Sequence, residues 1–401
     1  MRIGPWSKKP IMRKPNLDAV HNIDGLALLA QRRLPRVIFD FLDGGAEREV
    51  TLKANRAGFD QWQLLPEVLK GNASRTISVT LFGHEMQTPF LVAPTGLNGI
   101  LWPRGDSQLA RACARGGTGL CVSTASNESL ETLAQAGKGL KLFQLYTWGS
   151  REDWLALMRR AEQAGYHGLI LTADSLIAGN RERDKRNRFA HAVTLSPSTL
   201  IDGLTHPSWL FSTWLPHGMP RLENIADRLP AGSSAYELAA YGRKQRSEGL
   251  SWADVEWIRS QWRGPLLIKG ILRVSDALIA QRLGAEGIVI SNHGGRALDS
   301  VPATIDLLPE IASALGKDMT VLIDSGFRRG TDIVKALALG ADAVLLGRAP
   351  LYGLAAAGEQ GVAKALTLLA SEVERTLGQL GCASIAELNS AHVRRCLHGG
   401  R

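Results

Sequence analysis

The stretch LIDSGFRRGTDIVKALALGADAVLLGR (residues 322–348) holds two short apolar runs with an amphipathic segment between them. The first run, TVLID (320–324), continues into Ser-Gly, and the second, DAVLL (342–346), continues into Gly-Arg. Apolar runs this continuous are typical of parallel strands that are covered on both faces. The stretch therefore predicts a strand, a helix and a second parallel strand, which is the repeating unit of an α/β fold.

Six further runs of the same kind precede this stretch, and each leads into a polar or glycine-bearing turn. The segments between the runs carry helical spacing. Eight β/α units in sequence argue for a (β/α)8 TIM barrel. An open doubly wound sheet competes with it, but no G-x-G-x-x-G follows the first strand. The six runs are PFLVA (89–93), GLCVS (119–123), KLFQL (141–145), GLILT (168–172), PLLIK (265–269) and GIVIS (287–291).

The connection between the fourth and fifth runs is far longer than one helix needs. Residues of about 176–250 therefore predict an insertion at the mouth of the barrel. Its segment HPSWLFSTWLPHGMP (206–220) is rich in Trp, Leu and Phe. Two interpretations stay open: a lid packed on the barrel, or a peripheral membrane contact around residues 200–220 with aromatic side chains at headgroup depth.

The segments outside the barrel are short. Residues 1–20 predict an irregular basic arm, and residues 391–401 predict a C-terminal tail. The barrel domain is therefore expected to span residues 21–390. Residues 21–48 predict a helical segment ahead of the first strand.

Composition excludes several classes of protein. Of the 401 residues, 45% are apolar and 21% charged, which is ordinary for a globular domain and not for extended disorder. No run of about 18 apolar residues occurs, so no transmembrane helix is expected. The N-terminus lacks the apolar region of a Sec signal, and the four cysteines form no CxxC motif, so we expect a cytoplasmic protein without a metal site. The net charge is +9, but zinc-finger spacing and RNP aromatic runs are lacking, so no nucleic-acid partner is expected.

Polar groups stand at all eight expected strand ends. Catalytic groups of barrels lie at the C-terminal ends of the strands, because the βα loops converge there. The loops after the seventh and eighth strands form the common phosphate site of such barrels. Arg328 and Arg348, beside glycine-rich backbone, suit a phosphate dianion. The alternative is that these arginines form surface salt bridges.

The motif SNHGGRALD (291–299) carries the candidate catalytic group. His293 is a candidate general base, because its ordinary pKa lies near neutrality. Arg296 could bind a carboxylate with two hydrogen bonds. Asp174, at the end of the fourth strand, could orient the imidazole.

Two further cations have two readings each. Lys269 could form a Schiff base, as in a barrel lyase, or stabilise an electron-rich cofactor ring as a cation. Arg181 could be a second carboxylate ligand or part of a solvated charge run.

Long motifs of this chain resemble those of the FMN-dependent α-hydroxy-acid dehydrogenases and oxidases. They are SNHGGRALD, the 322–348 stretch, FQLY (143–146) and LTAD (171–174), and the resemblance covers residues of about 21–390. Within the family the likeness is greatest to the mandelate dehydrogenases. It rests on APTGLNGILWPRGD (93–106), STASN (123–127), RERDKRNRF (181–189) and HGMP (217–220).

The resemblance implies a TIM barrel that holds FMN at its C-terminal mouth. Lys269 would lie near flavin N1 and stabilise the reduced, anionic ring, which disfavours the Schiff-base role. The other implied contacts to the ring are Ala93, Pro94, Thr95, Ser123, Gln144 and Thr172. Those to the ribityl chain and phosphate are Ser291, Asp324, Gly326, Arg328, Gly347 and Arg348.

For the substrate, the resemblance implies an (S)-2-hydroxy acid that is oxidised to the 2-oxo acid. Arg181 and Arg296 would bind its carboxylate, and Tyr146 would bond its hydroxyl or carboxylate. His293 would take a proton while two electrons pass to the flavin, with Asp174 supporting the imidazolium. Carbanion and hydride schemes need these same groups, and the sequence does not separate them.

Three positions refine the expectation. The family usually has a substrate-binding tyrosine in a stretch like PRVIFDFLDGGA (35–46), and we assign that position to Phe39, which loses one hydrogen bond to the substrate carboxylate. Gly96 resembles family members that pass electrons to a carrier, which favours a quinone-type acceptor. Ala125 is small where glycolate oxidases are bulky, which leaves room for an aromatic side group.

Alternatives within the family are an L-lactate dehydrogenase and a hydroxy-acid oxidase that uses O2. Outside it are the Schiff-base lyase and a non-catalytic flavin-binding protein that has lost its activity. A quinone acceptor would place the cytoplasmic protein peripherally on the inner face of the cell membrane. The family also implies a homo-oligomer, a tetramer.

Overall fold

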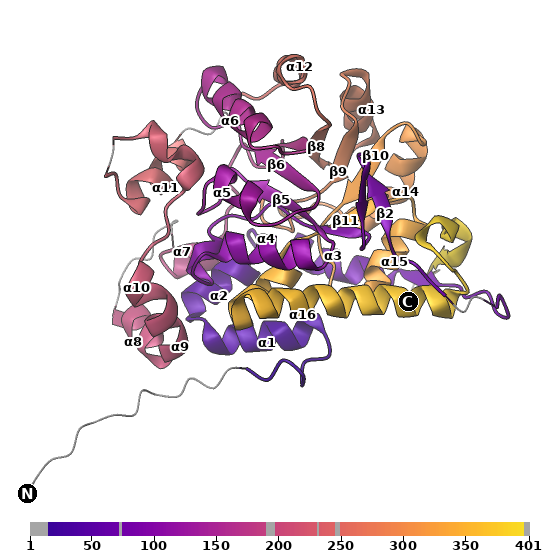
Figure 1. Cartoon of the computed structure of the whole chain (residues 1–401), viewed down its shortest axis with the longest axis horizontal. Coiled ribbons are helices and arrows are strands. Elements are labelled where there is room, and N and C mark those ends of the chain that lie inside the picture. The colour runs from indigo at the N-terminus through magenta and orange to yellow at the C-terminus, as the bar shows by residue number, and fades with distance from the viewer. Residues whose placement is uncertain (1–14, 72–73, 190–196, 231, 245–248, 397–401) are drawn as a thin grey trace, which may run out of the picture.

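A computed structural model describes residues 15–71, 74–189, 197–230, 232–244 and 249–396 of the chain, and its centre is a closed barrel of eight parallel strands (Figure 1). The strands are β4 (Phe90–Val92), β5 (Gly119–Ser123), β6 (Lys141–Leu145), β7 (Gly168–Thr172), β8 (Leu266–Ile271), β9 (Gly287–Ile290), β10 (Thr320–Ile323) and β11 (Ala343–Leu346). The first strand β4 pairs with the last strand β11, so the barrel closes. This confirms the predicted TIM barrel and excludes the open doubly wound sheet.

The barrel interior changes from apolar to mainly polar in one step along the strands. One apolar side chain from each strand packs in the interior core: Leu91, Cys121, Leu142, Ile170, Leu267, Val289, Leu322 and Leu345. Side chains alternate along a strand, so the residue two positions on faces the same interior but lies nearer the C-terminal mouth. Those residues are Ala93, Ser123, Gln144, Thr172, Lys269, Ser291, Asp324 and Gly347. The predicted strand-end groups therefore form one layer directly above the core.

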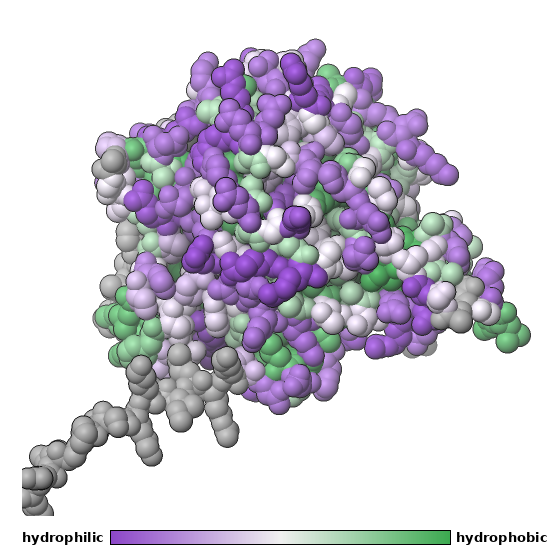
Figure 2. All heavy atoms as spheres, viewed as in Figure 1, coloured by the Kyte–Doolittle hydropathy of each residue, from purple (hydrophilic) through white to green (hydrophobic). Residues whose placement is uncertain are grey.

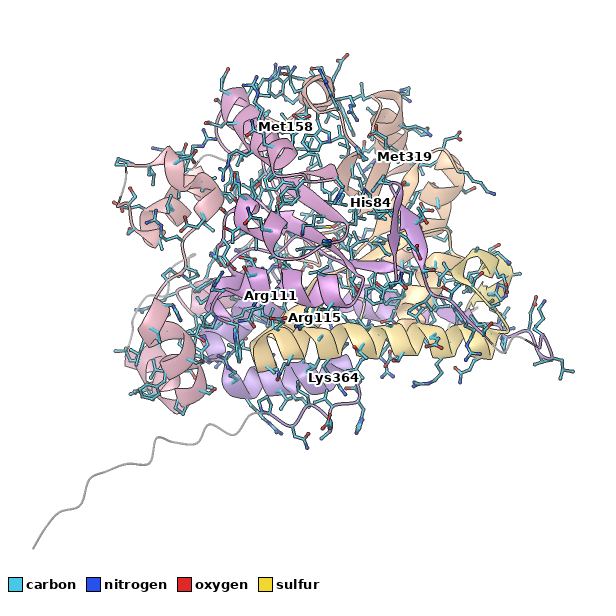
Figure 3. All side chains as sticks on the ribbon, viewed as in Figure 1. His84, Arg111, Arg115, Met158, Met319 and Lys364 are labelled. Carbon is cyan, nitrogen blue, oxygen red and sulfur yellow. The ribbon has the colours of Figure 1, made fainter. Side chains whose placement is uncertain are left out.

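Helices follow the strands and cover the barrel (Figure 1): α4 (Gly105–Arg115), α5 (Leu130–Gln135), α6 (Arg151–Gln163), α12 (Trp252–Gln261), α13 (Val274–Arg282), α14 (Thr304–Leu315), α15 (Gly330–Ala338) and α16 (Arg348–Leu380). Arg111 and Arg115 of α4 both pair with Glu359 of α16, at 2.7 and 2.6 Å. Figure 3 shows these two arginines where α4 lies over α16. The first and last β/α units are thus joined on the outer surface as well as in the sheet.

The N-terminal segment is helical, as predicted, but it is broken. It forms α1 (Ile23–Arg33), α2 (Arg36–Asp43) and α3 (Val50–Asp60). Pro35 separates α1 from α2 because it has no N–H to continue the first helix. Arg36 N at the start of α2 donates instead to Asp202 Oδ2 of the insertion, at 2.6 Å.

The described part of the segment that we predicted as a C-terminal tail (391–401) has regular structure. A short strand β12 (Val393–Arg395) pairs antiparallel with β1 (Trp62–Leu64), and η5 (Ser390–His392) precedes it. Strand pairing therefore ties residues 393–395 to the domain. A hairpin of β2 (Val79–Leu81) and β3 (His84–Met86) packs on the interior core at the N-terminal end of the barrel. Residues 1–14 of the predicted basic arm lie outside the described residues.

The long connection after β7 forms helices beside the barrel mouth (Figure 1): α7 (Glu182–Arg186), α8 (Pro197–Thr205), α9 (Pro207–Trp209), the π-helical turn η2 (Leu210–Trp214), α10 (Leu215–His217), η3 (Glu223–Arg228) and α11 (Ala235–Lys244). One side packs on the barrel, since Trp209 Nε1 donates to Ile100 O at 2.7 Å and its ring stacks on Trp214. Arg33 of α1 also donates to Ser212 Oγ and Thr213 Oγ1.

The other side of this insertion exposes large apolar side chains to solvent. They are Leu200, Ile201, Leu204, Phe211 and Leu215, each 49–68% exposed. Figure 2 shows hydrophobic atoms gathered where α8 to α10 lie in Figure 1. We call these five residues the apolar patch. Among the described residues no helix is both long and apolar enough to cross a bilayer.

Candidate active site

A cavity of about 250 Å³ opens at the C-terminal mouth of the barrel. Its walls come from the strand ends, from α2 and from the insertion. Most of the predicted site residues line it: Ala93, Pro94, Thr95, Tyr146, Arg181, Lys269, His293, Arg296, Asp324, Gly326, Arg328, Gly347 and Arg348. Ser123, Gln144, Thr172, Asp174 and Ser291 do not line the cavity. They belong to the strand ends or the turns after them, and hydrogen bonds or strand pairing join them to its walls.

An imidazole faces the cavity between a phenol and a carboxylate. His293 Nδ1 lies 2.8 Å from Asp174 Oδ1, and His293 Nε2 lies 3.5 Å from the hydroxyl of Tyr146. His293 has a φ of 57°, a left-handed conformation that is uncommon outside glycine. Gly294 and Gly295 continue in the same region, at 65° and 72°. The His-Gly-Gly turn therefore aims Nε2 into the cavity while Asp174 holds Nδ1.

Lys269 is 3% exposed, and it lies between two carboxylates. Its Nζ donates to Ser291 Oγ at 2.8 Å and lies 3.3 Å from Asp324 Oδ2 and 3.8 Å from Asp174 Oδ2. Burial opposes the charged amine, but the two carboxylates outweigh burial and raise the pKa of Lys269. A Schiff base requires a neutral amine, so this environment disfavours the lyase interpretation.

The buried carboxylate of Asp174 is held in its ionised form. Burial alone would raise the pKa of Asp174, but the charges of Lys269 and His293 lower it below its ordinary value. The ionised carboxylate accepts a hydrogen bond from His293 Nδ1 and so orients the ring with Nε2 towards Tyr146.

Two arginines are fixed by the C-terminal end of α2. Arg296 donates to Phe41 O and Gly44 O, both at 2.8 Å, and Arg348 donates to Leu42 O, Gly44 O and Gly294 O at 2.8–3.2 Å. The last carbonyls of a helix have no partner within it, so they accept these bonds readily. Burial, followed by the charges of Arg181 and Arg348, lowers the pKa of Arg296. This concentration of positive charge is suited to an anion.

The structure does not bring Phe39 to the cavity. Phe39 packs against the hydrophobic core, whereas Phe41 lines the cavity. The guanidinium groups of Arg181 and Arg296 lie over the Phe41 ring, 5.6 and 5.3 Å from its centre. Residues two apart on a helix point in nearly opposite directions, since each residue turns by about 100°. The assignment to Phe39 was therefore wrong, and Phe41 is the ring that lies beside Arg181 and Arg296.

Two buried polar atoms test whether FMN fits. Gln144 Nε2 and Thr172 Oγ1, on the neighbouring strands β6 and β7, have no hydrogen-bond partner within the described part of the chain. Ser123 Oγ donates to Gln144 Oε1, which leaves the amide N–H groups of Gln144 free to donate. The pyrimidine edge of a flavin offers acceptors and a donor for such groups. These orphaned atoms therefore suit the ring of FMN.

The opposite end of the cavity suits a phosphate. A Cβ added to Gly347 at the end of β11 would meet no atom within 4 Å, so the space above it is open. Arg328 and Arg348 line this end. An open space with glycine backbone and two guanidinium groups can accept a dianion. The residues present thus fit both ends of FMN, and a cluster that could hold a metal ion does not occur among the residues described.

Sequence reasoning missed several cavity residues. Trp148 stands two positions after Tyr146, so its nearness to FQLY was an available signal. Leu222 and Gly242 come from the insertion, whose sequence gives no sign of which residues face the barrel. Phe41 lies two residues after Phe39 in the same helix, and the sequence does not show which of the two faces the cavity.

The fold and the site together define a class: a TIM-barrel enzyme whose mouth is built for an anionic cofactor and an anionic substrate. The family model described as FMN-dependent dehydrogenase matches residues 30–395. The chain belongs to this family of FMN-dependent 2-hydroxy-acid dehydrogenases and oxidases, which confirms the resemblance and the cofactor expected from the sequence.

Several relatives cover nearly the whole chain. (S)-Mandelate dehydrogenase of Pseudomonas putida is 44% identical over 374 residues, 93% of each chain. A putative L-lactate dehydrogenase of Mycobacterium tuberculosis is 39% identical over 95% of this chain and 90% of its own. Glycolate oxidase 3 of Arabidopsis thaliana is 37% identical over 94% and 96%.

A solved structure shows the same fold. A crystal structure of (S)-mandelate dehydrogenase, described as a monotopic membrane protein, superposes with a TM-score of 0.91 at 43% identity. The match covers 94% of this chain and all of that one.

Proposed function

We propose that this chain oxidises an (S)-2-hydroxy acid with an aromatic side group, such as mandelate, to the 2-oxo acid, and passes the electrons to a quinone-type acceptor. The observation that carries the proposal is the line Tyr146–His293–Asp174, which faces the guanidinium groups of Arg181 and Arg296 across one cavity. The 44% identity to (S)-mandelate dehydrogenase supports the aromatic substrate.

The arginines bind and orient the substrate. Arg296 is fixed by two carbonyls of α2, and Arg181 Nε lies 3.3 Å from Asp184 Oδ2. A carboxylate between these two groups gains charge-assisted hydrogen bonds that also fix its plane. The hydroxyl of the same substrate then lies towards Tyr146 and His293.

His293 takes the proton. Its Nε2 faces the cavity, and Asp174 holds Nδ1, so the nitrogen that accepts the proton is defined. Bound FMN supplies a two-electron acceptor. Gln144 and Thr172 would hold the edge of its ring, Arg328 and Arg348 its phosphate, and the cation of Lys269 would stabilise negative charge on the ring.

The test is an absorption spectrum of the FMN-loaded protein before and after anaerobic addition of (S)-mandelate, with L-lactate and glycolate alongside. Bleaching of the flavin band by mandelate at the lowest concentration supports the proposal. Faster bleaching by lactate or glycolate would show that the substrate is a small hydroxy acid and not an aromatic one. If air reoxidises the reduced flavin rapidly and a quinone does so no faster, the protein is an oxidase and not a dehydrogenase.

The apolar patch supports a peripheral membrane contact through residues 200–220. Five large apolar side chains on short helices beside the mouth would bury their surface at a lipid interface. The homologous (S)-mandelate dehydrogenase structure is described as monotopic. Such a position would bring the cavity near a quinone dissolved in the membrane.

Vesicle flotation tests this contact. The double substitution Leu204→Glu with Phe211→Glu should release the protein from anionic phospholipid vesicles and keep it yellow. The control is Leu69→Glu, which changes an equally apolar, fully exposed side chain outside the insertion. Undiminished vesicle binding by the double variant would contradict the proposed surface. The homotetramer implied by the family is a separate prediction for sedimentation to check.

A further inference from the structure

We propose that Trp148 and Gly242 together determine which side group the cavity accepts, and that they favour a planar aryl group over a short alkyl group. This inference rests on the proposed oxidation of an aromatic 2-hydroxy acid and names the residues that select it. Neither residue bonds the reacting groups, so both are specificity-determining rather than catalytic.

The substrate's polar end leaves one direction for its side group. The carboxylate and hydroxyl are bound by Arg181, Arg296 and the Tyr146–His293 pair. The turns after β5 and β6 and the insertion contribute apolar or small residues to the cavity lining: Ala125, Trp148, Ala178, Leu222 and Gly242. We infer that the side group contacts these residues, of which Trp148 has the largest side chain.

Trp148 is stacked on the ring of Tyr146. The two ring centres lie 5.2 Å apart and the planes are inclined by only 8°. Trp148 N also donates to Tyr146 O at 2.9 Å, which holds the two residues in one tight turn. The indole thus lies parallel to the phenol and lines the same cavity. An aryl side group gains both buried area and ring contacts there.

Gly242 leaves room for the indole in this position. A Cβ added at Gly242 would lie 3.1 Å from Cζ3 and 3.3 Å from Cε3 of Trp148. Gly242 lies within α11, where glycine is less favourable than alanine, and its φ is not left-handed. The glycine is therefore explained by packing, because the Trp148 ring occupies the place of a side chain.

Two alanines leave space in the cavity for an aryl ring. Ala125 follows β5 and Ala178 begins the insertion, and both present a single methyl group to the cavity. An aryl ring needs such space next to Trp148, whereas a methyl side group would leave it unfilled. Unfilled apolar space loses contacts on both surfaces, which disfavours the small substrate.

The experiment measures binding and turnover separately in the FMN-loaded protein. Calorimetry gives the Kd of phenylglyoxylate and of pyruvate, and steady-state assays give kcat/KM for (S)-mandelate and L-lactate. We expect the wild type to prefer the aryl member of each pair by about tenfold or more. One additional methylene group in an apolar pocket already gives about tenfold discrimination, and a phenyl group is larger. Trp148→Ala should lower both preferences by about tenfold.

Gly242→Ala should lower both preferences in the same direction by a smaller factor, because the ring must shift. Gly203→Ala is the matched control: it is also a helical glycine of the insertion, but an added Cβ meets nothing within 4 Å. It should leave both preferences unchanged. Trp148→Leu keeps apolar bulk at the site if Trp148→Ala does not fold.

The outcomes separate this inference from the proposed function. Unchanged aryl preferences in both Trp148 variants would overturn the inference, and so would a wild type that binds pyruvate as tightly as phenylglyoxylate. If aryl binding is selective and depends on Trp148 but no hydroxy acid reduces the flavin, the inference holds and the proposed oxidation fails.

Discussion

The two halves of the cavity are built in different ways. The half that suits FMN is built on the strand ends one alternation above the interior core, where Ala93, Lys269, Asp324 and Gly347 line the cavity, and these strands pair around a closed barrel. The half proposed to receive the substrate side group consists of α2, the turn after β6 and parts of the insertion, which side-chain hydrogen bonds such as those of Trp209 and Asn224 join to the barrel. The difference teaches that chemistry and selectivity can change independently here. The barrel half should tolerate little change, and the insertion half should shift preference while the reaction persists.

The largest expected effect lies in the barrel half. His293→Asn removes the base but leaves Lys269 and Arg348 in place, so kcat should fall by about 10²–10⁴-fold. FMN content, measured from the visible spectrum, should be unchanged. A fall in kcat of less than about tenfold would show that His293 is not the proton acceptor.

The next largest effect concerns Asp106, which joins two loops at the mouth of the barrel. Asp106 Oδ1 accepts from Asn98 Nδ2 at 2.6 Å, and its Oδ2 accepts from Asn127 N at 2.7 Å, so it joins the loops after β4 and β5. Burial, only partly offset by these hydrogen bonds, raises the pKa of Asp106 from 3.8 to about 7. The folded state therefore holds the proton more tightly than the unfolded state.

Because the folded state binds this proton more tightly, the free energy of unfolding decreases as the pH rises. The contribution to stability is fully present below about pH 4 and is lost as the pH rises towards 7, at about 1.4 kcal/mol per pH unit within the window. Thermal midpoints at pH 5, 6 and 7 should fall less steeply in Asp106→Asn than in the wild type. Asp318→Asn, on an exposed turn, should keep the wild-type slope.

A gain of function would sharpen the comparison at α2. Phe41→Tyr places a hydroxyl beside Arg181 and Arg296, where it can donate to the substrate carboxylate. A hydrogen bond to a charged group is worth about 1.5–3 kcal/mol, so kcat/KM for mandelate should rise by about tenfold or more. Phe39→Tyr, two residues earlier, should change it by less than about twofold. An equal gain in both variants would contradict the assignment to Phe41.

The smallest effect belongs to Arg33, one of several residues that join the insertion to the barrel. Arg33 donates to Leu101 O and Ala355 O on the barrel side and to Ser212 and Thr213 in the insertion. Burial lowers the pKa of Arg33 to about 10, so it stays charged at neutral pH. Lysine cannot reproduce the planar fork, so Arg33→Lys should loosen the insertion.

Proteolysis should detect that change. Cleavage within residues 200–220 should become faster in Arg33→Lys, and the mandelate-to-lactate preference should fall by about two- to threefold while kcat for lactate is kept. Cleavage at the wild-type rate would show that Trp209 and its neighbours hold the insertion without Arg33.

The sequence predicted the barrel half well because its positions follow a local rule. Once the apolar runs are identified, alternation places Lys269, Ser291 and Asp324 on one surface, whatever the rest of the chain does. The insertion half obeys no such rule. Gly242 reaches Trp148 only through the folding of a long connection, and the choice between Phe39 and Phe41 depends on how α2 is rotated. The strand β12 was missed because its partner β1 lies more than 300 residues earlier.

The pairing of the two chain ends has a consequence for synthesis. α1 packs on α16, β4 closes the barrel against β11, and β1 receives β12 (Figure 1). During translation the N-terminal half must leave the ribosome with an open strand edge and an uncovered helix face, because its partners have not yet been made. Unpaired edges and exposed apolar faces are what chaperones bind and what aggregates form from. The nascent chain therefore exposes these surfaces until β11, α16 and β12 have emerged, and a chain that stops near residue 340 lacks all three partners.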